Sequence, residues 1–300
     1  MAVVTGKPVT QGGVRGRNEA TGLGAYFALR EFLAYDEIIK KTGLKDGLFG
    51  ARIIIQGFGN VGSWAAHFFV EHGAKVIGVV ERDGAVLCAA GIDVGALRDH
   101  ISTHHSIRGF TGNGLQYYEN PAHVMESECD ILVPAALEQQ IHVGNMHRIR
   151  AKIILEAANG PTTPSADKYF YDHGIVVLPD LLVNAGGVVV SYFEWLKNLS
   201  HVRFGRMNKR WDEYSKAKVL ELIEQGTGKS LDPQLKQLAI HGAEEHHLVY
   251  SGLEDTMINA CRETRLTAMS KNIDFRKAAI LNAINKVAMV TDTSGMIFMR

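Results

Sequence analysis

The sequence is poor in the features that mark secreted, disulfide-stabilised and membrane proteins. Its three cysteines, Cys88, Cys129 and Cys261, lie far apart and form no CxxC pair. This usage argues against a disulfide framework or a paired-cysteine zinc site, and it suits a reducing compartment. No apolar run approaches the roughly 20 residues that a membrane-spanning helix needs. The first residues, MAVVTGKPVTQGG, have no basic stretch before an apolar core, so they do not form a secretory signal.

An excess of charge of either sign is also missing. The 300 residues contain 32 Lys and Arg against 32 Asp and Glu, so the formal net charge is zero. Such a chain has no overall positive field that would attract nucleic acid or an anionic membrane. With 46% hydrophobic and 21% charged residues, it has the composition of a globular protein with one large or two modest domains. We expect no nucleic-acid or membrane partner, and a location in the cytoplasm or mitochondrial matrix rather than secretion.

Short apolar runs that alternate with helical patterns predict an α/β fold. A first helix is expected from Asn18 to Lys41, with Asn18 as its N-cap and Gly43 as its stop signal. The elements expected after it are a strand at Arg52–Gln56, a helix at Asn60–His72, and strands at Lys75–Val80, Asp130–Pro134, Lys152–Leu155 and Ile175–Leu178. Strands that alternate with helices favour a Rossmann-like, doubly wound and mostly parallel sheet.

Beyond Asn184 the strand signals stop and a helical region follows. The helices expected there are Val188–Leu199, Lys209–Glu224, Glu254–Ser270 and Phe275–Val290, with a loop at Gly226–Pro233. We expect three parts: a dinucleotide-binding domain over residues 1–200, a helical excursion over 201–248, and C-terminal helices over 249–300 that pack back on the domain.

Three glycines carry the clearest chemical signal. Gly57, Gly59 and Gly62 form a G-x-G-x-x-G pattern that follows a predicted strand and opens a predicted helix. In a dinucleotide-binding turn the first glycine makes the tight turn, the second lets the backbone approach the pyrophosphate, and the third lets the helix pack on the strand. The pyrophosphate would rest on the N–H groups of the helix N-terminus. A glycine-rich turn without a ligand is the alternative.

Glu81 and Arg82 bear on the choice between NAD and NADP. Glu81 ends the second predicted strand, 19 positions beyond Gly62, where an acid can accept hydrogen bonds from the ribose hydroxyls of NAD. It would repel a 2′-phosphate by ~1 to 4 kcal/mol at 4 Å. Arg82 could instead bind that phosphate. We expect NAD as the cofactor, with NADP possible, unless the two residues form a solvated charge pair.

Five segments resemble the family of glutamate, leucine, phenylalanine and valine dehydrogenases, and most closely its glutamate dehydrogenases. They are TGKPVTQGGVRGRNEATG (Thr5–Gly22), IIIQGFGNVG (Ile53–Gly62), CDILVPAA (Cys129–Ala136), EAANGPTTPSAD (Glu156–Asp167) and LPDLLVNAGGVVVSYFEWLKN (Leu178–Asn198). The similarity continues through SGLEDTM (Ser251–Met257). It covers nearly the whole chain but only the NAD(P)-binding half of the usual subunit of the family.

The resemblance implies roles for individual residues. Beside the residues of the glycine pattern and its acidic–basic pair (Gly57, Gly59, Gly62, Glu81 and Arg82), those that it implies bind the cofactor are Thr21, Gln56, Phe58, Asn60, Val61, Ala135, Ala136, Asn159 and Asn184. Among them, Thr21, Asn159 and Asn184 match residues at the nicotinamide, and Ala135 and Ala136 the segment under its ribose. Arg17, Val188 and Ser191 match substrate-binding positions, with Ser191 at the side-chain carboxylate of L-glutamate.

The residues themselves support part of this assignment. Asn159 and Asn184 follow predicted strands, at the edge where doubly wound sheets bind ligands, and an amide can pair with a carboxamide. The alternative is that both are turn residues with left-handed backbone angles. Ser191 would otherwise be interpreted as an ordinary hydroxyl on a helix face.

The chain also departs from the family pattern. It has no Lys-Gly-Gly segment, and we expect the catalytic lysine and aspartate in an N-terminal substrate domain that is absent here, so no catalytic residue is assigned in this chain. It is interpreted as a domain fragment, a split-gene product or a protein with another role. The leading hypothesis is half of a glutamate dehydrogenase, inactive alone and part of a homo-oligomer at full length; the alternative is a non-catalytic dinucleotide-binding module with a regulatory or assembly role.

Two features of the helical region remain open. Arg203–Leu248 resembles a shortened antenna excursion of animal-type glutamate dehydrogenases, but its charges also fit an ordinary solvated helical face. His241, Glu245, His246 and His247 raise the question of a metal site. Because compatible further ligands are not evident, we interpret them as a surface histidine cluster and expect no metal.

Overall fold

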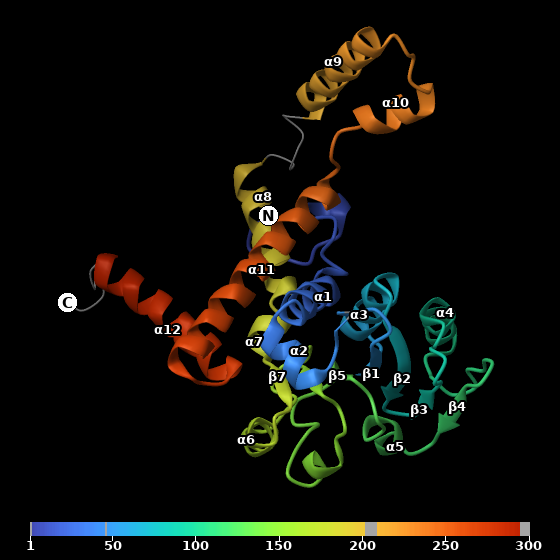
Figure 1. Ribbon diagram of the computed structural model, residues 1–300, viewed down its shortest axis with the longest axis vertical. Coiled ribbons are helices and arrows are strands. Elements are labelled where there is room, and N and C mark those ends of the chain that lie inside the picture. Colours follow the sequence, from blue (N-terminus) through green and yellow to red (C-terminus); the bar gives the residue numbers. More distant parts are fainter. Residues whose placement is uncertain (1, 46, 202–208, 295–300) are drawn as a thin grey trace. The chain divides into compact units, whose positions relative to one another are not determined.

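The computed structural model describes residues 2–45, 47–201 and 209–294 (Figure 1). The chain divides into two compact units. One contains Glu19–Val188 and Glu254–Arg300 and is called the sheet unit here; the other contains Met1–Asn18 and Val189–Leu253 and is called the helical unit. The three-part division expected from the sequence stays a prediction. None of the described helices is both long enough and apolar enough to cross a membrane.

A seven-stranded sheet with the order β4-β3-β2-β1-β5-β6-β7 forms the centre of the sheet unit. Its strands are β1 (Arg52–Gln56), β2 (Lys75–Glu81), β3 (Gly84–Leu87), β4 (Gln116–Tyr118), β5 (Ile131–Pro134), β6 (Ile153–Leu155) and β7 (Val176–Leu178). β1 pairs in parallel with both β2 and β5, and the parallel pairing continues through β6 to β7. This confirms the Rossmann-like, mostly parallel sheet.

Two strands that the sequence did not indicate, the edge strand β4 and its neighbour β3, are antiparallel. β3 pairs antiparallel with β2, and β4 pairs antiparallel with β3. Gly84 has φ +144°, and Glu81 pairs with it across the tight connection from β2. The strands have four and three residues, too short for a period of two to be distinguished from a loop.

Helices of the sheet unit lie on both faces of the sheet. The helical elements of this unit are α1 (Ala20–Leu33), α2 (Asp36–Thr42), α3 (Asn60–Glu71), α4 (Val94–His104), α5 (Ala122–Met125), the 3-10 turn η2 (Met146–Arg148), α6 (Pro164–Asp172), α7 (Asp180–Val183) and α12 (Phe275–Ser294). Ile54, Leu132 and Ile154 pack with α5 and α6 residues such as Val124 and Phe170 in one apolar cluster. α3 lies on the opposite face, since a Cβ at Gly62 would meet the side chain of Ile55 at 3.1 Å.

The single helix expected over residues 18–41 was wrong, because the chain forms two helices there. Tyr35 adopts an extended conformation, with φ −95° and ψ 129°, between α1 and α2. Asp36 and Glu37 then occupy the first turn of α2, where acidic groups stabilise a helix start. The N-cap of α1 is Glu19 rather than Asn18, whereas Gly43 does end α2, in the left-handed conformation with φ +73°.

The helical unit contains the 3-10 turn η1 (Val9–Gln11), α9 (Lys209–Thr227) and α10 (Pro233–Ile240). α8 (Gly186–Ser200) and α11 (Glu245–Lys271) contribute residues to both units. α10 was not expected, and the loop before it begins after Thr227 rather than at Gly226. The start of the expected excursion, Arg203, lies outside the described residues, and both interpretations of the excursion stay open.

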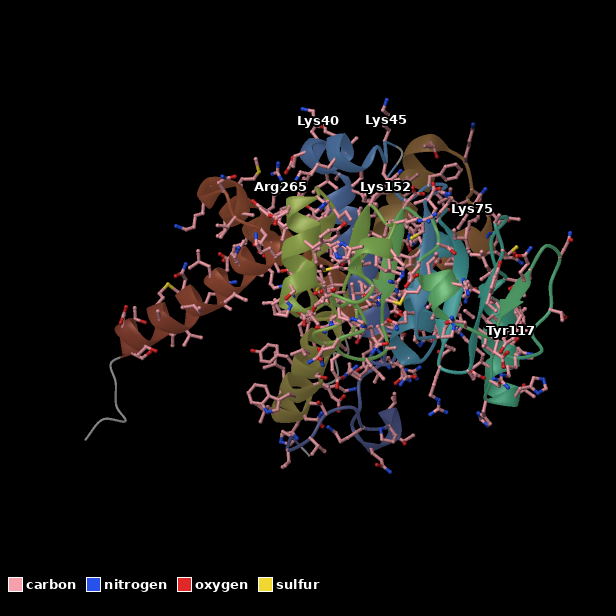
Figure 2. All side chains as sticks on the ribbon, turned by 90° about the horizontal axis from the view of Figure 1, so that it is seen from below. Lys40, Lys45, Lys75, Tyr117, Lys152 and Arg265 are labelled. Atoms are coloured by element: carbon pink, nitrogen blue, oxygen red, sulfur yellow. The ribbon has the colours of Figure 1, made fainter. Side chains whose placement is uncertain are left out.

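Basic side chains occupy the amino edge of the parallel strands. Lys75 begins β2 and Lys152 immediately precedes β6; both are labelled in Figure 2. Lys152 pairs with Asp130 at 2.9 Å, and the Arg52 backbone N–H donates to the same carboxylate at 2.9 Å. This edge is held by its own ion pairs, and the candidate site lies at the opposite, carboxyl edge.

Candidate functional site

The glycine turn follows β1 at the point where the sheet order reverses. β1 lies between β2 and β5, and its last residue, Gln56, is in register with Val80 on one side and Pro134 on the other. Ligands of open α/β sheets bind outside the carboxyl ends of strands at such a switch point. The Gly57 N–H donates to Val80 O at 2.7 Å, which fixes the entrance of the turn.

Each glycine of the turn meets a different steric requirement. Gly57 has φ +87°, and a Cβ there would lie 2.9 Å from Ala135 O. A Cβ on Gly62 would lie 1.8 Å from Gly57 O, so only glycine allows this contact between α3 and the turn. A Cβ on Gly59 would meet none of the described atoms within 4 Å. Gly57 and Gly62 are therefore required by the fold itself, whereas Gly59 faces open space.

Glu81 ends β2 and reaches the same turn. Its Oε1 accepts a hydrogen bond from the backbone N–H of Phe58. The sequence placed Glu81 at this strand end correctly, but it did not indicate this contact with the backbone. A carboxylate in this position both stabilises the turn and places negative charge beside it.

A cleft of about 660 Å³ opens at this edge of the sheet. Five of the predicted cofactor residues line it: Gln56, Gly57, Glu81, Arg82 and Ala136. Residues that the sequence analysis did not single out complete the wall: Val80, Asp83, His105, Pro121, Ala122, Met125, Leu137, Gln140, His142 and Asn145. Many of them follow the carboxyl ends of β2 and β5, which was the one signal that could have identified them.

Gln56 leaves a polar atom in the cleft wall without a partner. Its Nε2 donates to Gln140 Oε1 at 2.8 Å, while its Oε1 is buried and has no hydrogen-bond partner among the described residues. Buried polar atoms in folded proteins are nearly always paired. An unpaired acceptor beside the glycine turn is consistent with a hydrogen bond to a bound group.

Asn159 and Asn184 lie together. Asn159 follows β6, Asn184 is the C-cap residue of α7, and the Asn184 Nδ2 donates to Asn159 Oδ1 at 2.7 Å. Neither residue has a positive φ; Asn184 has φ −87°. Left-handed backbone geometry is thus not the reason for an asparagine at either position, and the interpretation of both as left-handed turn residues is wrong. The side chains are used to pair with each other.

Thr21 lies in the first turn of α1, on a segment that packs against the residues after Asn184. Gly24 of α1 and Gly186 approach closely, because a Cβ on Gly186 would lie 2.3 Å from Ala20 O and 3.0 Å from Gly24 Cα. α1 and α7 are also in contact. The start of α1 and the segment carrying Asn184 are therefore held against each other by two glycines.

The residues matched to substrate binding are found on α8 and near the N-terminus. Arg17 and Ser191 belong to the helical unit, where the Arg17 Nε donates to Ser191 Oγ at 2.8 Å. Val188 lies three positions before Ser191 in the same helix, and 71% of it is exposed. The hydroxyl of Ser191 is thus oriented by a guanidinium group.

Within the described residues, no group of three or more His, Cys, Asp or Glu side chains is placed to hold a metal ion, the histidines of the helical unit included. Glu244 pairs with His241 at 3.5 Å and with His246 at 3.6 Å. The pKa of Glu244 is lowered, first by its contact with His241. These residues form a small polar cluster at the surface.

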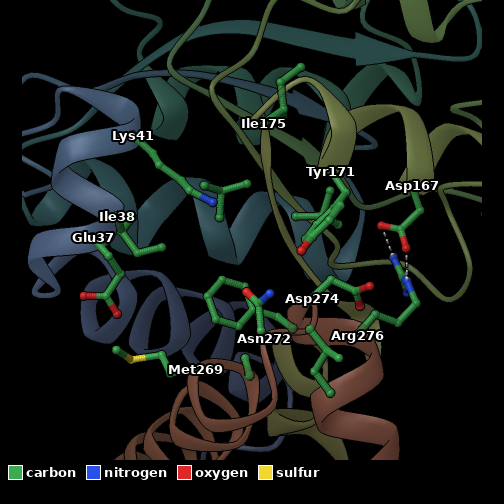
Figure 3. A pocket seen from close by; sticks show the side chains of 15 residues that line it. Glu37, Ile38, Lys41, Asp167, Tyr171, Ile175, Met269, Asn272, Asp274 and Arg276 are labelled. Carbon is green, nitrogen blue, oxygen red and sulfur yellow. Dashed lines mark hydrogen bonds and ion pairs between the residues drawn. The ribbon is translucent and has the colours of Figure 1, made fainter.

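A second cavity, of about 210 Å³, lies elsewhere in the sheet unit (Figure 3). Residues of α2, α6, β7, the end of α11 and the start of α12 line it, including Lys41, Tyr171, Met269 and Arg276. None of the residues assigned to the cofactor or the substrate takes part in this lining. The cavity is therefore separate from the cleft at the glycine turn.

Comparison with known proteins decides the family. The family model described as Glutamate/Leucine/Phenylalanine/Valine dehydrogenase matches residues 12–246. The chain belongs to this dehydrogenase family. "Glutamate dehydrogenase, mitochondrial" of Dictyostelium discoideum is 55% identical to this family member over 298 residues, which are 99% of the chain and 59% of the relative. The chain thus spans about three-fifths of the length of that relative.

Two further comparisons agree with this membership. "Catabolic NAD-specific glutamate dehydrogenase RocG" of Bacillus subtilis is 43% identical over 195 residues, covering 65% of this chain and 43% of the relative. The crystal structure of hetero-hexameric glutamate dehydrogenase from Thermus thermophilus, in a Leu-bound form, matches with a TM-score of 0.71 and 25% identity. That match covers 98% of this chain and 57% of the solved one. The family and the fold class predicted from the sequence are confirmed.

Proposed function

We propose that the chain is the NAD(P)-binding half of a glutamate dehydrogenase. The reaction of the whole enzyme would be L-glutamate + NAD(P)⁺ + water to 2-oxoglutarate + ammonia + NAD(P)H. The observation that carries the proposal is the Asn159–Asn184 pair, which lies at the carboxyl edge of the same sheet as the glycine turn in a member of this family. An isolated glycine turn would support dinucleotide binding alone.

The residues present fit a dinucleotide. The N-cap residue of α3 is Gly59, which has no side chain to satisfy the first N–H groups of the helix, and these groups suit a pyrophosphate. We assign Phe58, Asn60 and Val61 to this part of the cofactor. Gln56 Oε1 supplies an unpaired acceptor nearby.

The remaining cofactor residues are assigned to the sugar and ring ends. Ala135 and Ala136, which follow β5, would lie beneath the nicotinamide ribose, and Thr21, Asn159 and Asn184 would hold the ring and its carboxamide. When bound, the cofactor accepts a hydride at C4 of its nicotinamide. The contribution of this chain is to orient the ring and to fix its carboxamide by hydrogen bonds.

NAD is proposed as the preferred cofactor because Glu81 places a carboxylate in the cleft beside the turn. A 2′-phosphate there would be repelled, while Arg82, which also lines the cleft, would attract it. The balance favours NAD and keeps NADP possible. The name of the Bacillus subtilis relative, which includes "NAD-specific", is in line with this proposal.

For the substrate we propose that Ser191 binds the side-chain carboxylate of L-glutamate, and that Val188 and Arg17 are further substrate-binding residues. A hydroxyl that accepts from a guanidinium still has its own proton to donate to a carboxylate. An apolar amino acid would gain nothing from this hydroxyl. We therefore propose glutamate as the substrate, in preference to the branched-chain or aromatic substrates of the family.

We further propose that the groups that move protons belong to an N-terminal substrate domain, and that the full-length protein is a homo-oligomer in the cytoplasm or mitochondrial matrix. General acid–base groups typically contribute ~10²–10⁴ in rate, and productive geometry needs reactants held ~3–3.5 Å apart. The 300 residues alone are therefore expected to bind NADH but to oxidise little or no glutamate.

The test has a binding part and a catalytic part. The chain is titrated with NADH by calorimetry and fluorescence, and NADH formation from L-glutamate is then followed with and without a separately expressed N-terminal half of a family member. NADH binding together with turnover that needs the added half supports the proposal. Failure to bind NADH at millimolar concentration overturns it, as does robust turnover by the chain alone. Binding without turnover in the presence of the added half would favour the non-catalytic module.

A further inference from the structure

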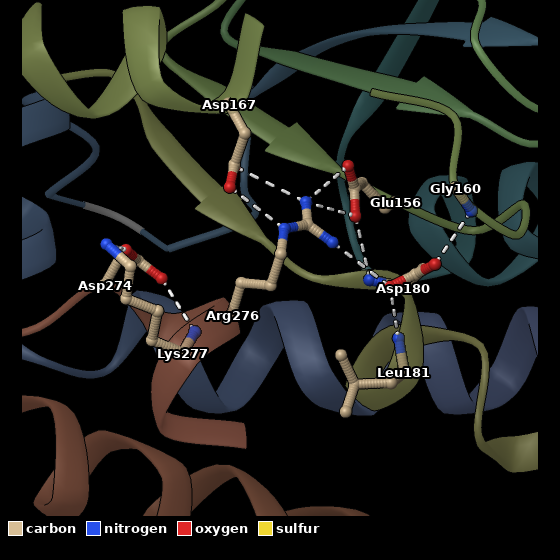
Figure 4. A network of polar contacts seen from close by, with 8 residues as sticks. All are labelled: Glu156, Gly160, Asp167, Asp180, Leu181, Asp274, Arg276 and Lys277. Atoms are coloured by element: carbon tan, nitrogen blue, oxygen red, sulfur yellow. Dashed lines mark hydrogen bonds and ion pairs between the residues drawn. The ribbon is translucent and has the colours of Figure 1, made fainter. Parts of the chain in front are cut away.

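Arg276, in the first turn of α12, lies among three carboxylates of the sheet unit (Figure 4). Its Nη2 donates to both oxygens of Glu156 at 2.8 Å, its Nε to Asp167 Oδ2 at 3.0 Å, and its Nη1 to Asp180 Oδ1 at 3.2 Å. Glu156 is fully buried, and the other two carboxylates are about 20% exposed. The adjacent Lys277 pairs instead with Asp274 at 2.8 Å.

Two of these carboxylates hold the backbone around the asparagine pair. Asp180 Oδ2 accepts from the Gly160 N–H at 2.8 Å, immediately after Asn159. Glu156 Oε2 accepts from the Asp180 N–H at 2.9 Å, at the start of α7, the helix whose C-cap residue is Asn184. The guanidinium of Arg276 therefore holds two carboxylates. One is Asp180, which accepts from the backbone after Asn159, and the other is Glu156, which accepts from the backbone at the start of α7.

The charge balance shows why the guanidinium is needed. Burial raises the pKa of Glu156 and outweighs the opposing effect of Arg276, and the network carries three acids against one cation. Without Arg276 the carboxylates would repel one another, and buried Glu156 would have no counter-ion. Asp180 would then be free to turn away from Gly160. A lysine has one ammonium in place of a planar fork of five N–H groups, so it cannot bind three carboxylates in this geometry.

We propose that Arg276 is a positioning residue for the nicotinamide. It acts through Asp180 and Glu156, whose contacts with Gly160 and the Asp180 N–H set the separation of Asn159 and Asn184. This inference rests on the proposed function, because it assigns that pair to the nicotinamide. The Arg276 network should affect only the nicotinamide end of the cofactor. The glycine turn and Glu81, which would hold the adenosine end, are not part of this network.

The test compares NADH with ADP-ribose, which lacks the nicotinamide ring. Dissociation constants for both are measured on the wild-type chain, on Arg276→Lys and on Asp180→Ala, with Lys277→Met as the matched control from the same helix turn. Both test variants should weaken NADH binding about tenfold, the effect of losing the net contribution of one hydrogen bond, and should leave ADP-ribose binding within about twofold. The control should change neither.

The outcomes separate this inference from the proposed function. If the variants bind NADH as the wild type does, or lose NADH and ADP-ribose equally, Arg276 has at most a structural role and the inference is overturned. If one variant fails to fold, shown by loss of its cooperative thermal transition, the other decides. A wild-type chain that binds neither ligand overturns the proposed function, and this inference with it.

Discussion

Asn184 donates a 2.7 Å hydrogen bond from its side-chain amide to Asn159 Oδ1, joining two segments that lie 25 positions apart in the sequence. The bond uses one donor of Asn184 and one lone pair of Asn159. The amide donors of Asn159 and the carbonyl oxygen of Asn184 remain for other partners. The pair therefore offers both a donor and an acceptor at one edge of the sheet, as a carboxamide requires.

Asn159→Ala and Asn184→Ala should each weaken NADH binding, and the double variant should weaken it by less than the sum of the two. The reason is that each single change also removes the partner that orients the remaining asparagine. We expect a coupling free energy of about 1 kcal/mol. A double-mutant cycle of NADH dissociation constants measures it. Strictly additive effects would show that the two residues act independently.

Glu81→Ser should narrow or invert the preference for NAD over NADP. Loss of the carboxylate removes ~1 to 4 kcal/mol of repulsion against a 2′-phosphate, which is roughly one to three decades in relative affinity. Glu81→Gln is the matched variant, since its amide oxygen can still accept from the Phe58 N–H without the charge. Both variants are titrated with NADH and NADPH. If the affinity ratio stays constant in both, Glu81 does not face the ribose.

Gly62→Ala and Gly59→Ala should separate a folding role from a binding role. A methyl group at Gly62 would lie 1.8 Å from Gly57 O, so this variant should lose about 2 kcal/mol and about 5 °C in Tm. Gly59→Ala meets no described atom within 4 Å, so its Tm should match the wild type while its NADH affinity falls. Thermal melts and NADH titrations check both. Normal NADH affinity in a folded Gly59→Ala variant would place the pyrophosphate elsewhere.

The buried ion pair between Lys7 and Glu194 should make the helical unit sensitive to acid. Burial alone would raise the pKa of Glu194, but its contacts with Lys7 and the Gly6 N–H outweigh burial and lower that pKa. A carboxyl group with a lowered folded-state pKa stabilises the fold above its unfolded pKa of ~4.3, and this stability is lost as the pH falls through the folded value. Wild-type stability should therefore decline below about pH 4.

Glu194→Gln isolates this contribution. It should lower the free energy of unfolding at pH 7 by about 3 kcal/mol, because Lys7 loses its partner, and the difference from wild type should shrink in acid. Asp172→Asn, in the exposed pair with Lys168, is the control and should have little effect. Denaturant melts from pH 3 to 7 measure these changes. A difference between wild type and Glu194→Gln that does not vary with pH would contradict this assignment.

The sequence was sufficient where local chemistry decides the structure. The apolar run at β1 and the glycines after it predicted both the strand and the turn, because a buried parallel strand and a left-handed glycine such as Gly57 have strong local preferences. The residues around Arg276 could not be foreseen in the same way. Glu156 and Arg276 are 120 positions apart and meet only through the packing of α12 near β7. Pairings of this kind depend on tertiary structure and leave no periodic signal.

The two edge strands of the sheet, β4 and β7, have three residues each, and this limits how another chain can pair with the sheet. β4 is short and mostly exposed, and β7 is contacted by α2, α6 and α12. An open strand edge is a template on which another chain can add a strand. The first turn of α12 therefore has a second effect besides holding Glu156 and Asp180. Its contact with β7, together with those of α2 and α6, leaves less of this edge open to another strand. We therefore expect a chain that lost α12 to become prone to misassembly as well as less ordered around Asn159.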